Sequence, residues 1–295
     1  LRKETARDHS EWTGISMDQI KLINGIKLPQ IGFGTWQITD RDQMAEVFSN
    51  AYDVGYRLFD TAAAYSNEIA LSKAIARKGL SREEYILSDK VWNTSRGCEA
   101  VQEACRRSLK KLKTDYFDLY LIHWPASMKL YPNWEEINAD TWRGMEQLYR
   151  DGMVKAIGVC NFKTHHLEAL KKTAEIMPMV DQVELHPGFN QNELLEYCRV
   201  NNMVVQASSP LGNGKILNNE DICAIAVEKK KTIAQVCLRW GLQKGAALIS
   251  KTVNIGRMQE NFDIFDFTLN EKEMDAIDNL PYCGGIGIDP DEVKE

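Results

Sequence analysis

Three polar side chains that are costly to bury lie at the ends of apolar segments. Asp60 ends the apolar part of YRLFDTA, Lys90 lies in YILSDKVW and His123 in YFDLYLIHW, while Tyr65 follows the first of these segments. Buried Asp, Lys and His need partners, so we expect these side chains to pair with one another or with a ligand. An Asp60–Lys90 ion pair beside Tyr65 would move the tyrosine pKa from near 10 toward the working pH. The set predicts a general acid, Tyr65, with no nucleophile, and His123 as a hydrogen-bond donor to a substrate oxygen.

Other polar side chains close or punctuate the later apolar segments, and each taken alone is explained as a helix cap or a solvated end. They are Asn161, Gln182, Glu184, Ser208, Ser209 and Lys251. Glu184 and His186 are more readily structural than catalytic, whereas Trp36 and Trp124 offer flat apolar walls for a small molecule. The histidines lack metal-ligand spacing, so we expect no metal site, and His165–His166 should lie at the surface.

The segment from Lys251 to Arg257 (KTVNIGR), followed by Glu260 and Asn261, gathers two cations with hydroxyl and amide groups. It falls at a predicted strand end and helix N-terminus, which is where phosphate groups bind. Because the chain is acidic, this local positive cluster predicts an anionic ligand.

The elements that position these residues alternate between short apolar strands and amphipathic helices. Eight strands are predicted, in the segments IGFGTW, YRLFDTA, YILSDKVW, YFDLYLIHW, VKAIGVCNF, MVDQVELHP, MVVQASSPLG and AALISKTV. From Gly34 to Lys251 the strand ends are about 31 residues apart, as in an α/β (β/α)₈ TIM barrel, whose active site lies at the carboxyl ends of the strands. A Rossmann sheet is disfavoured, since Gln37 stands where the third glycine of its fingerprint belongs. A two-residue turn at Asn24–Gly25 predicts an N-terminal β-hairpin.

Composition excludes several classes of protein. A net charge of -6 and a pI near 5.6 disfavour nucleic acid and anionic membranes as partners. Seven cysteines without a C-x-x-C pair indicate reduced thiols and a cytoplasmic location. We expect residues 1–16 to be a leader or disordered tail, and residues 17–295 to form a single barrel domain, because no linker interrupts the series.

The motifs GFGTW, LFDTAAAYSNE, LSDKVWN, DLYLIHWP, AIGVCNF, DQVELHP, SSPLG and ISKTVNIGRMQEN together resemble the aldo-keto reductase family, over about residues 18–295. The resemblance implies NADPH-dependent reduction of aldehydes and ketones, with NADPH/NADP⁺ as cofactor and a catalytic tetrad of Asp60, Tyr65, Lys90 and His123. It implies cofactor contacts at Gly34, Thr35, Trp36, Asp60, Cys160, Asn161, Gln182, Ser208, Ser209, Leu211, Lys251, Thr252, Val253, Asn254, Arg257, Glu260 and Asn261. Asn161 and Gln182 would contact the nicotinamide amide, and Lys251 and Arg257 the 2'-phosphate. Substrate contacts are implied at Trp36, Tyr65, Trp92, His123 and Trp124.

Three positions depart from the family pattern. Cys160 replaces a common serine, Ser208 replaces the aromatic ring that stacks on the nicotinamide, and Ser250 replaces a proline. The segment after the last helix is short, which resembles microbial members (diketogluconate reductase and prostaglandin F synthase-like) that act as monomers on small polar aldehydes, dicarbonyls and keto-sugars. Two alternatives remain open: a non-catalytic, redox-sensing barrel that binds NADP(H), and an aldolase with a Schiff base on Lys90.

Overall fold

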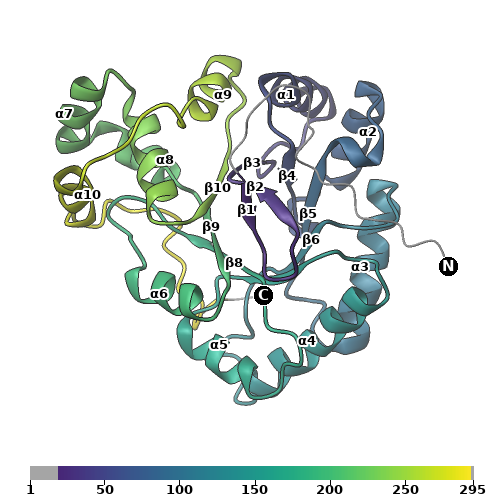
Figure 1. Cartoon of the computed structure of the whole chain (residues 1–295). Helices are drawn as coiled ribbons and strands as arrows, with labels where there is room; N and C mark the ends of the chain where they lie inside the picture. The colour runs from purple at the N-terminus through teal and green to yellow at the C-terminus, as the bar shows by residue number, and fades with distance from the viewer. Residues whose placement is uncertain (1–18, 294–295) are drawn as a thin grey trace.

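Eight short parallel strands pair in sequence order and close into a barrel. They are β3 (Ile31–Gly34), β4 (Leu58–Asp60), β5 (Ile86–Val91), β6 (Leu119–Ile122), β7 (Ile157–Cys160), β8 (Val180–Glu184), β9 (Val204–Ser208) and β10 (Ala247–Ser250). Because β10 pairs with both β3 and β9, the barrel has no free edge (Figure 1). This computed structural model describes residues 19–293, and the predicted barrel and its eight strands are confirmed. The expected leader at residues 1–16 lies outside the described residues.

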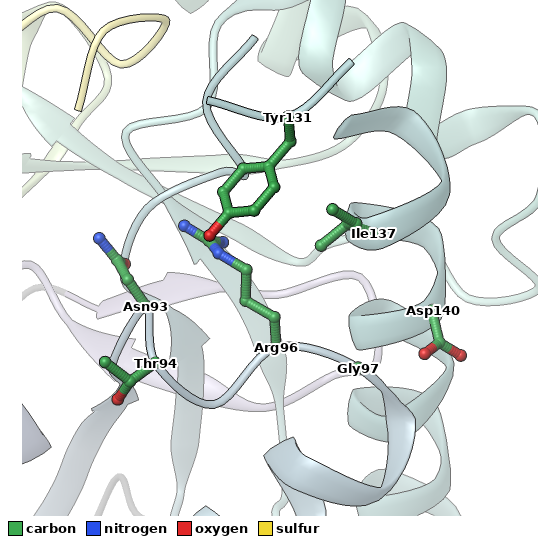
Figure 2. A pocket seen from close by; sticks show the side chains of 7 residues that line it. All are labelled: Asn93, Thr94, Arg96, Gly97, Tyr131, Ile137 and Asp140. Carbon is green, nitrogen blue, oxygen red and sulfur yellow. The ribbon is translucent and has the colours of Figure 1, made fainter. Parts of the chain in front are cut away.

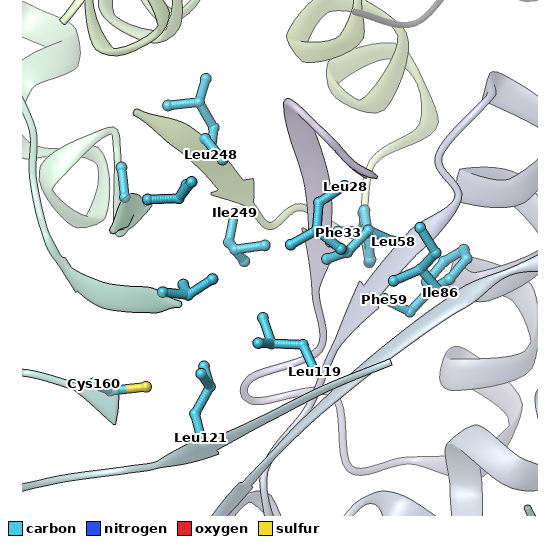
Figure 3. Close-up of a cluster of buried hydrophobic side chains, with 14 of the residues drawn as sticks. Leu28, Phe33, Leu58, Phe59, Ile86, Leu119, Leu121, Cys160, Leu248 and Ile249 are labelled. Carbon is cyan, nitrogen blue, oxygen red and sulfur yellow. The ribbon is translucent and has the colours of Figure 1, made fainter. Parts of the chain in front are cut away.

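The strands are buried because both of their faces are covered, as is usual for parallel strands. Side chains from several strands meet in one continuous core, part of which is drawn in Figure 3. Gly32 shows how tightly this core is packed: an added Cβ would lie 2.4 Å from Leu58 and 2.8 Å from Ile249. The barrel interior is therefore filled at this level, which leaves its carboxyl end for a ligand.

Helices surround the barrel on its outside (Figure 1). Those that follow the strands are α1 (Arg41–Val54), α2 (Glu68–Lys78), α3 (Cys98–Leu112), α4 (Trp134–Arg150), α5 (Thr164–Lys171), α6 (Asn192–Val200), α8 (Ile233–Gln243) and α9 (Ile255–Phe262). Two more, α7 (Glu220–Lys229) and α10 (Glu271–Asp278), contact each other beside this ring. The connection between β9 and β10 thus holds two helices, α7 and α8. Within residues 19–293, none of the helices combines the length and apolar character needed to span a bilayer.

An antiparallel hairpin of β1 (Gln19–Lys21) and β2 (Lys27–Pro29) precedes the barrel, as predicted. The prediction of a two-residue turn was wrong, because the turn is one residue longer. Gly25 N donates to Leu22 O at 2.9 Å, so Ile23 and Asn24 occupy the centre of the turn. Gly25 follows with φ 91°, a conformation that favours glycine. The Asn24 side chain donates instead to Lys155 O, 2.9 Å away, and this bond ties the hairpin to the barrel.

Candidate functional site

A buried ion pair forms the centre of the site. Lys90 Nζ lies 2.5 Å from Asp60 Oδ2, and the two side chains are 1% and 3% exposed. Lys90 Nζ also donates to Thr61 O at 2.9 Å, and Ser88 Oγ donates to Asp60 Oδ1 at 3.0 Å. The parallel register of β4 and β5 places Asp60 opposite Ser88, so the sheet itself brings these groups together. Sequence reasoning did not identify Ser88, which reads only as a polar residue inside an apolar strand.

Tyr65 is the last residue of a 3₁₀ turn, η2 (Ala63–Tyr65), that follows β4. The buried Asn67 fixes this loop, because its amide donates to Thr35 O and accepts from Thr61 Oγ1. The Tyr65 ring lies over Lys90, with Nζ 5.2 Å from the ring centroid. Burial raises the pKa of Tyr65 to about 12, and this outweighs the lowering by the Lys90 charge. Lys90 therefore acts in the predicted direction, but the predicted net shift toward working pH was wrong: in the protein alone Tyr65 is a neutral phenol at pH 7.

His123 follows β6 and packs edge-on against two aromatic rings. Its ring centroid lies 5.7 Å from that of Tyr65 and 5.2 Å from that of Trp92. Burial, together with the Lys90 charge, holds the His123 pKa well below its usual value, so the imidazole is neutral. Its Nδ1 atom is buried and has no hydrogen-bond partner among residues 19–293. A neutral ring of this kind carries one N–H donor and one acceptor.

Amide side chains from the next strands complete the centre. Asn161, in the left-handed conformation with φ 62°, donates from Nδ2 to His123 O at 2.8 Å. Gln182 Nε2 donates to Asp60 Oδ1 at 3.1 Å and to Gln206 Oε1 at 2.6 Å. Cys160, at the end of β7, is buried near Lys90, and burial raises the pKa of its thiol. Gln206 was missed because it stands in the middle of a strand, where the sequence pattern shows only its burial.

The predicted phosphate-binding residues form a second group at the end of β10 and the start of α9. Asn254 caps this helix by accepting from Arg257 N at 3.0 Å, and Thr252 Oγ1 accepts from Asn254 N at 3.2 Å. Lys251 and Arg257 are exposed, and neither forms an ion pair within residues 19–293. Glu260 accepts instead from Thr232 Oγ1 at 2.7 Å.

The remaining predicted cofactor residues differ in exposure. Asn261 is only 3% exposed, whereas Val253 is 47% exposed. Ser208 is half-buried at the end of β9, and Ser209 follows with φ 47°. Leu211 precedes the turn η4 (Gly212–Asn218). Gly34 ends β3, and Thr35 Oγ1 donates to Asp60 O at 3.0 Å.

The two tryptophans predicted as pocket walls differ in the same way. Trp36 is 43% exposed, while Trp124 is 8% exposed. Arg96 fixes the backbone at Trp124, since Nη1 donates to Trp124 O and Nη2 to Pro125 O. A neighbouring cavity of about 370 Å³ lies between the loop after β5 and α4. Figure 2 shows the residues that line it: Asn93, Thr94, Arg96, Gly97, Tyr131, Ile137 and Asp140. None of the predicted site residues lines it, so it lies beside the site.

The C-terminal segment is bonded to the loops at the carboxyl end of the barrel. Glu184 accepts from Ile286 N at 2.7 Å, and a Cβ on Gly285 would lie 1.7 Å from its Oε1 atom. His186 is fully buried and bonded to Glu184 at 3.1 Å, so this pair has the structural role that was favoured. Further along, Ser127 Oγ donates to Asp291 O at 2.8 Å.

His165, His166 and Asp291 place three possible metal-ligand atoms within 4.8 Å of one another. The expectation that both histidines lie at the surface was wrong for His166, which is 0% exposed. Its Nδ1 atom accepts from Lys163 N at 3.0 Å. Burial lowers its pKa to about 4, so the neutral ring carries its proton on Nε2, 3.0 Å from Asp291. In this tautomer Nε2 cannot ligate a metal.

Comparisons with known proteins agree on one family. The model described as "Aldo/keto reductase family" matches residues 30–281. The chain is 45% identical to a glyoxal reductase of Bacillus subtilis, over 94% of this chain and 97% of that protein. It is 38% identical to the methylglyoxal reductase DkgA of Escherichia coli K12, over 92% and 97%.

The comparison with solved structures also finds aldo/keto reductases. An aldo/keto reductase from Brucella melitensis superposes with a TM-score of 0.83 at 42% identity, covering 89% of this chain and 99% of that one. A mutant of Gox0644 in complex with NADPH gives a TM-score of 0.87 at 37% identity, covering 95% and 100%.

Proposed function

Because this chain belongs to the aldo/keto reductase family, an oxidoreductase family whose members reduce carbonyl groups, we propose that it reduces small carbonyl compounds with NADPH, using Tyr65 as general acid. One observation carries the proposal. A neutral phenol, with its pKa raised to about 12, lies over a buried ammonium and beside a neutral imidazole. This arrangement holds a proton and a positive charge next to each other at the carboxyl end of the barrel. The same features disfavour a Schiff base on Lys90, whose pKa is raised by Asp60 although burial alone would lower it.

The side chains present fit a dinucleotide phosphate. Lys251 and Arg257 are two exposed cations without a carboxylate partner among the described residues, in a chain of net charge -6. They flank the N-terminus of α9, whose backbone N–H groups favour an anion. Gln182 and Asn161 would hold the nicotinamide amide, and Lys251 and Arg257 the 2'-phosphate. When bound, NADPH supplies the hydride that the protein cannot supply itself.

The protein's own residues then manage the proton. Tyr65 gives its phenolic proton to the carbonyl oxygen as the carbonyl carbon is reduced, so the product is an alcohol. Lys90 stabilises the phenolate that this step leaves behind, and Asp60 keeps Lys90 charged and in place. His123, being neutral, donates one hydrogen bond to the same oxygen. Tyr65 regains its proton from solvent before the next turnover.

We further propose small polar aldehydes and dicarbonyls as substrates, with keto-sugars next. The support is the identity with glyoxal and methylglyoxal reductases. A cytoplasmic monomer, with residues 17–295 as one domain, is proposed with it, and the family match over residues 30–281 supports the single domain.

The test is Tyr65→Phe, which removes only the hydroxyl group. We expect NADPH oxidation with methylglyoxal to fall by about 10²- to 10⁴-fold, the usual contribution of general acid catalysis. NADPH binding, followed by protein fluorescence, should be unchanged. The wild-type rate of reduction should stay flat from about pH 6 to 9, because a phenol of raised pKa keeps its proton there. Unchanged turnover in the variant would remove Tyr65 from the mechanism.

A further inference from the structure

Gln206 lies on β9 directly opposite Gln182 on β8, since the two residues are register partners in the barrel. They are 1% and 4% exposed, and their side chains meet in a hydrogen bond of 2.6 Å. Neither the family resemblance nor the catalytic proposal uses Gln206. A buried amide bonded to a proposed cofactor ligand needs its own explanation, because burial of an amide is costly unless its partners are specific.

The partners of Gln182 determine which way its amide faces. Asp60 is ion-paired to Lys90, so its Oδ1 atom can only accept, and the atom of Gln182 that faces it must be Nε2. Gln206 contacts the same nitrogen and therefore presents its Oε1 atom. Both protons of the Gln182 amide are then used within the protein. Its Oε1 atom is left as the acceptor for a ligand.

Two hydrogen bonds from one nitrogen fix the plane of an amide, whereas one bond leaves it free to rotate about that bond. We infer that Gln206 is a positioning residue: it locks the Gln182 amide so that Oε1 accepts from the carboxamide N–H of the nicotinamide. This role rests on the proposed function, in which Gln182 contacts that group. Gln206 thereby makes the site selective for a cofactor whose ring carries an N–H donor.

The test compares two cofactors in the same variants. Reduced 3-acetylpyridine adenine dinucleotide phosphate keeps the carbonyl of NADPH but has a methyl group where NADPH has its amide N–H. In Gln206→Met, which has a similar side-chain length but no acceptor, we expect the dissociation constant for NADPH to rise about 3- to 10-fold, as for one lost neutral hydrogen bond. The dissociation constant for the acetylpyridine cofactor should change by less than about twofold. The ratio of the two constants is taken within one folded protein, so a general loss of stability cancels.

Gln182→Met and the double variant complete the design. Gln182→Met should remove the preference for NADPH, and adding Gln206→Met to it should change the ratio no further, because Gln206 acts through Gln182. Equal losses for both cofactors in Gln206→Met, or an additive effect in the double variant, would overturn the positioning role. If Gln182→Met leaves the ratio unchanged, the proposed contact of Gln182 with the nicotinamide is wrong as well. If Gln182→Met removes the preference for NADPH while Gln206→Met keeps the wild-type ratio of the two dissociation constants, only the role of Gln206 is overturned.

Discussion

Replacement of Lys90 by methionine should leave the Asp60 carboxylate buried in the barrel without its ion-pair partner. Methionine keeps much of the aliphatic length of lysine but lacks the charge. Asp60, whose side chain is 3% exposed, then retains the donors Ser88 and Gln182 among the described residues. Breaking one partner of a buried ion pair typically costs about 3–5 kcal/mol. Since whole domains are stable by about 5–15 kcal/mol, the expected loss is a large part of the total.

The assay is urea unfolding of the wild type, Lys90→Met, Asp60→Asn and the double variant, at pH 7. Asp60→Asn alone should also destabilise, because it removes the negative charge that pairs with the buried Lys90 ammonium and leaves neutral acceptors such as Thr61 O. The double variant should be more stable than Lys90→Met by about 2 kcal/mol or more, since no buried charge remains. A loss below about 1 kcal/mol in Lys90→Met, or a double variant no more stable than the single ones, would refute the reasoning.

Two further predictions concern the buried carboxyl group of Asp89 and the exposed cation Arg257. Asp89 is fully buried, burial raises its pKa, and its Oδ1 atom accepts from Lys90 N. A raised folded-state pKa means that the stability contributed by this group is complete below its unfolded pKa of 3.8 and is lost as the pH rises. Asp89→Asn should therefore stabilise by about 1 kcal/mol or more at pH 8 and less at pH 5, in thermal unfolding. The matched control, Asp118→Asn, should destabilise, because Asp118 is paired with Arg82 and Lys155; a gain that does not vary with pH would contradict the explanation. At the phosphate group, Arg257→Met should weaken NADPH binding about tenfold or more and leave NADH binding unchanged, in fluorescence titrations. Equal loss for both cofactors would show that Arg257 does not contact the 2'-phosphate.

Much of the site's location followed from the sequence. Asp60, Lys90, His123 and Asn161 lie at or beside the carboxyl ends of their strands, and parallel strands bring these ends to one edge, whereas Gln182 lies inside β8. That rule requires only the order of strands and the residue at each end. The N-terminal hairpin was predicted too, although its turn is one residue longer than expected.

How deeply each side chain is buried was not predictable in the same way. The sign of the Tyr65 pKa shift depends on a balance between burial, which raises it, and the Lys90 charge, which lowers it. The sequence shows that both groups exist but not how much water reaches the phenol. His166 was likewise expected at the surface, and only the packing of α5 and the contact with Asp291, 125 positions away in the chain, accounts for its burial.

The sequence by itself determined the strand order, and therefore which residue types gather at the carboxyl end of the barrel. Only the tertiary structure decided which of them touch. Gln206 is the clearest case, since its contact with Gln182 depends on the register of β8 and β9, and Asp60 then fixes which atom of the amide it meets. Register and side-chain partners arise from packing around the closed barrel, and no local pattern in the chain specifies them.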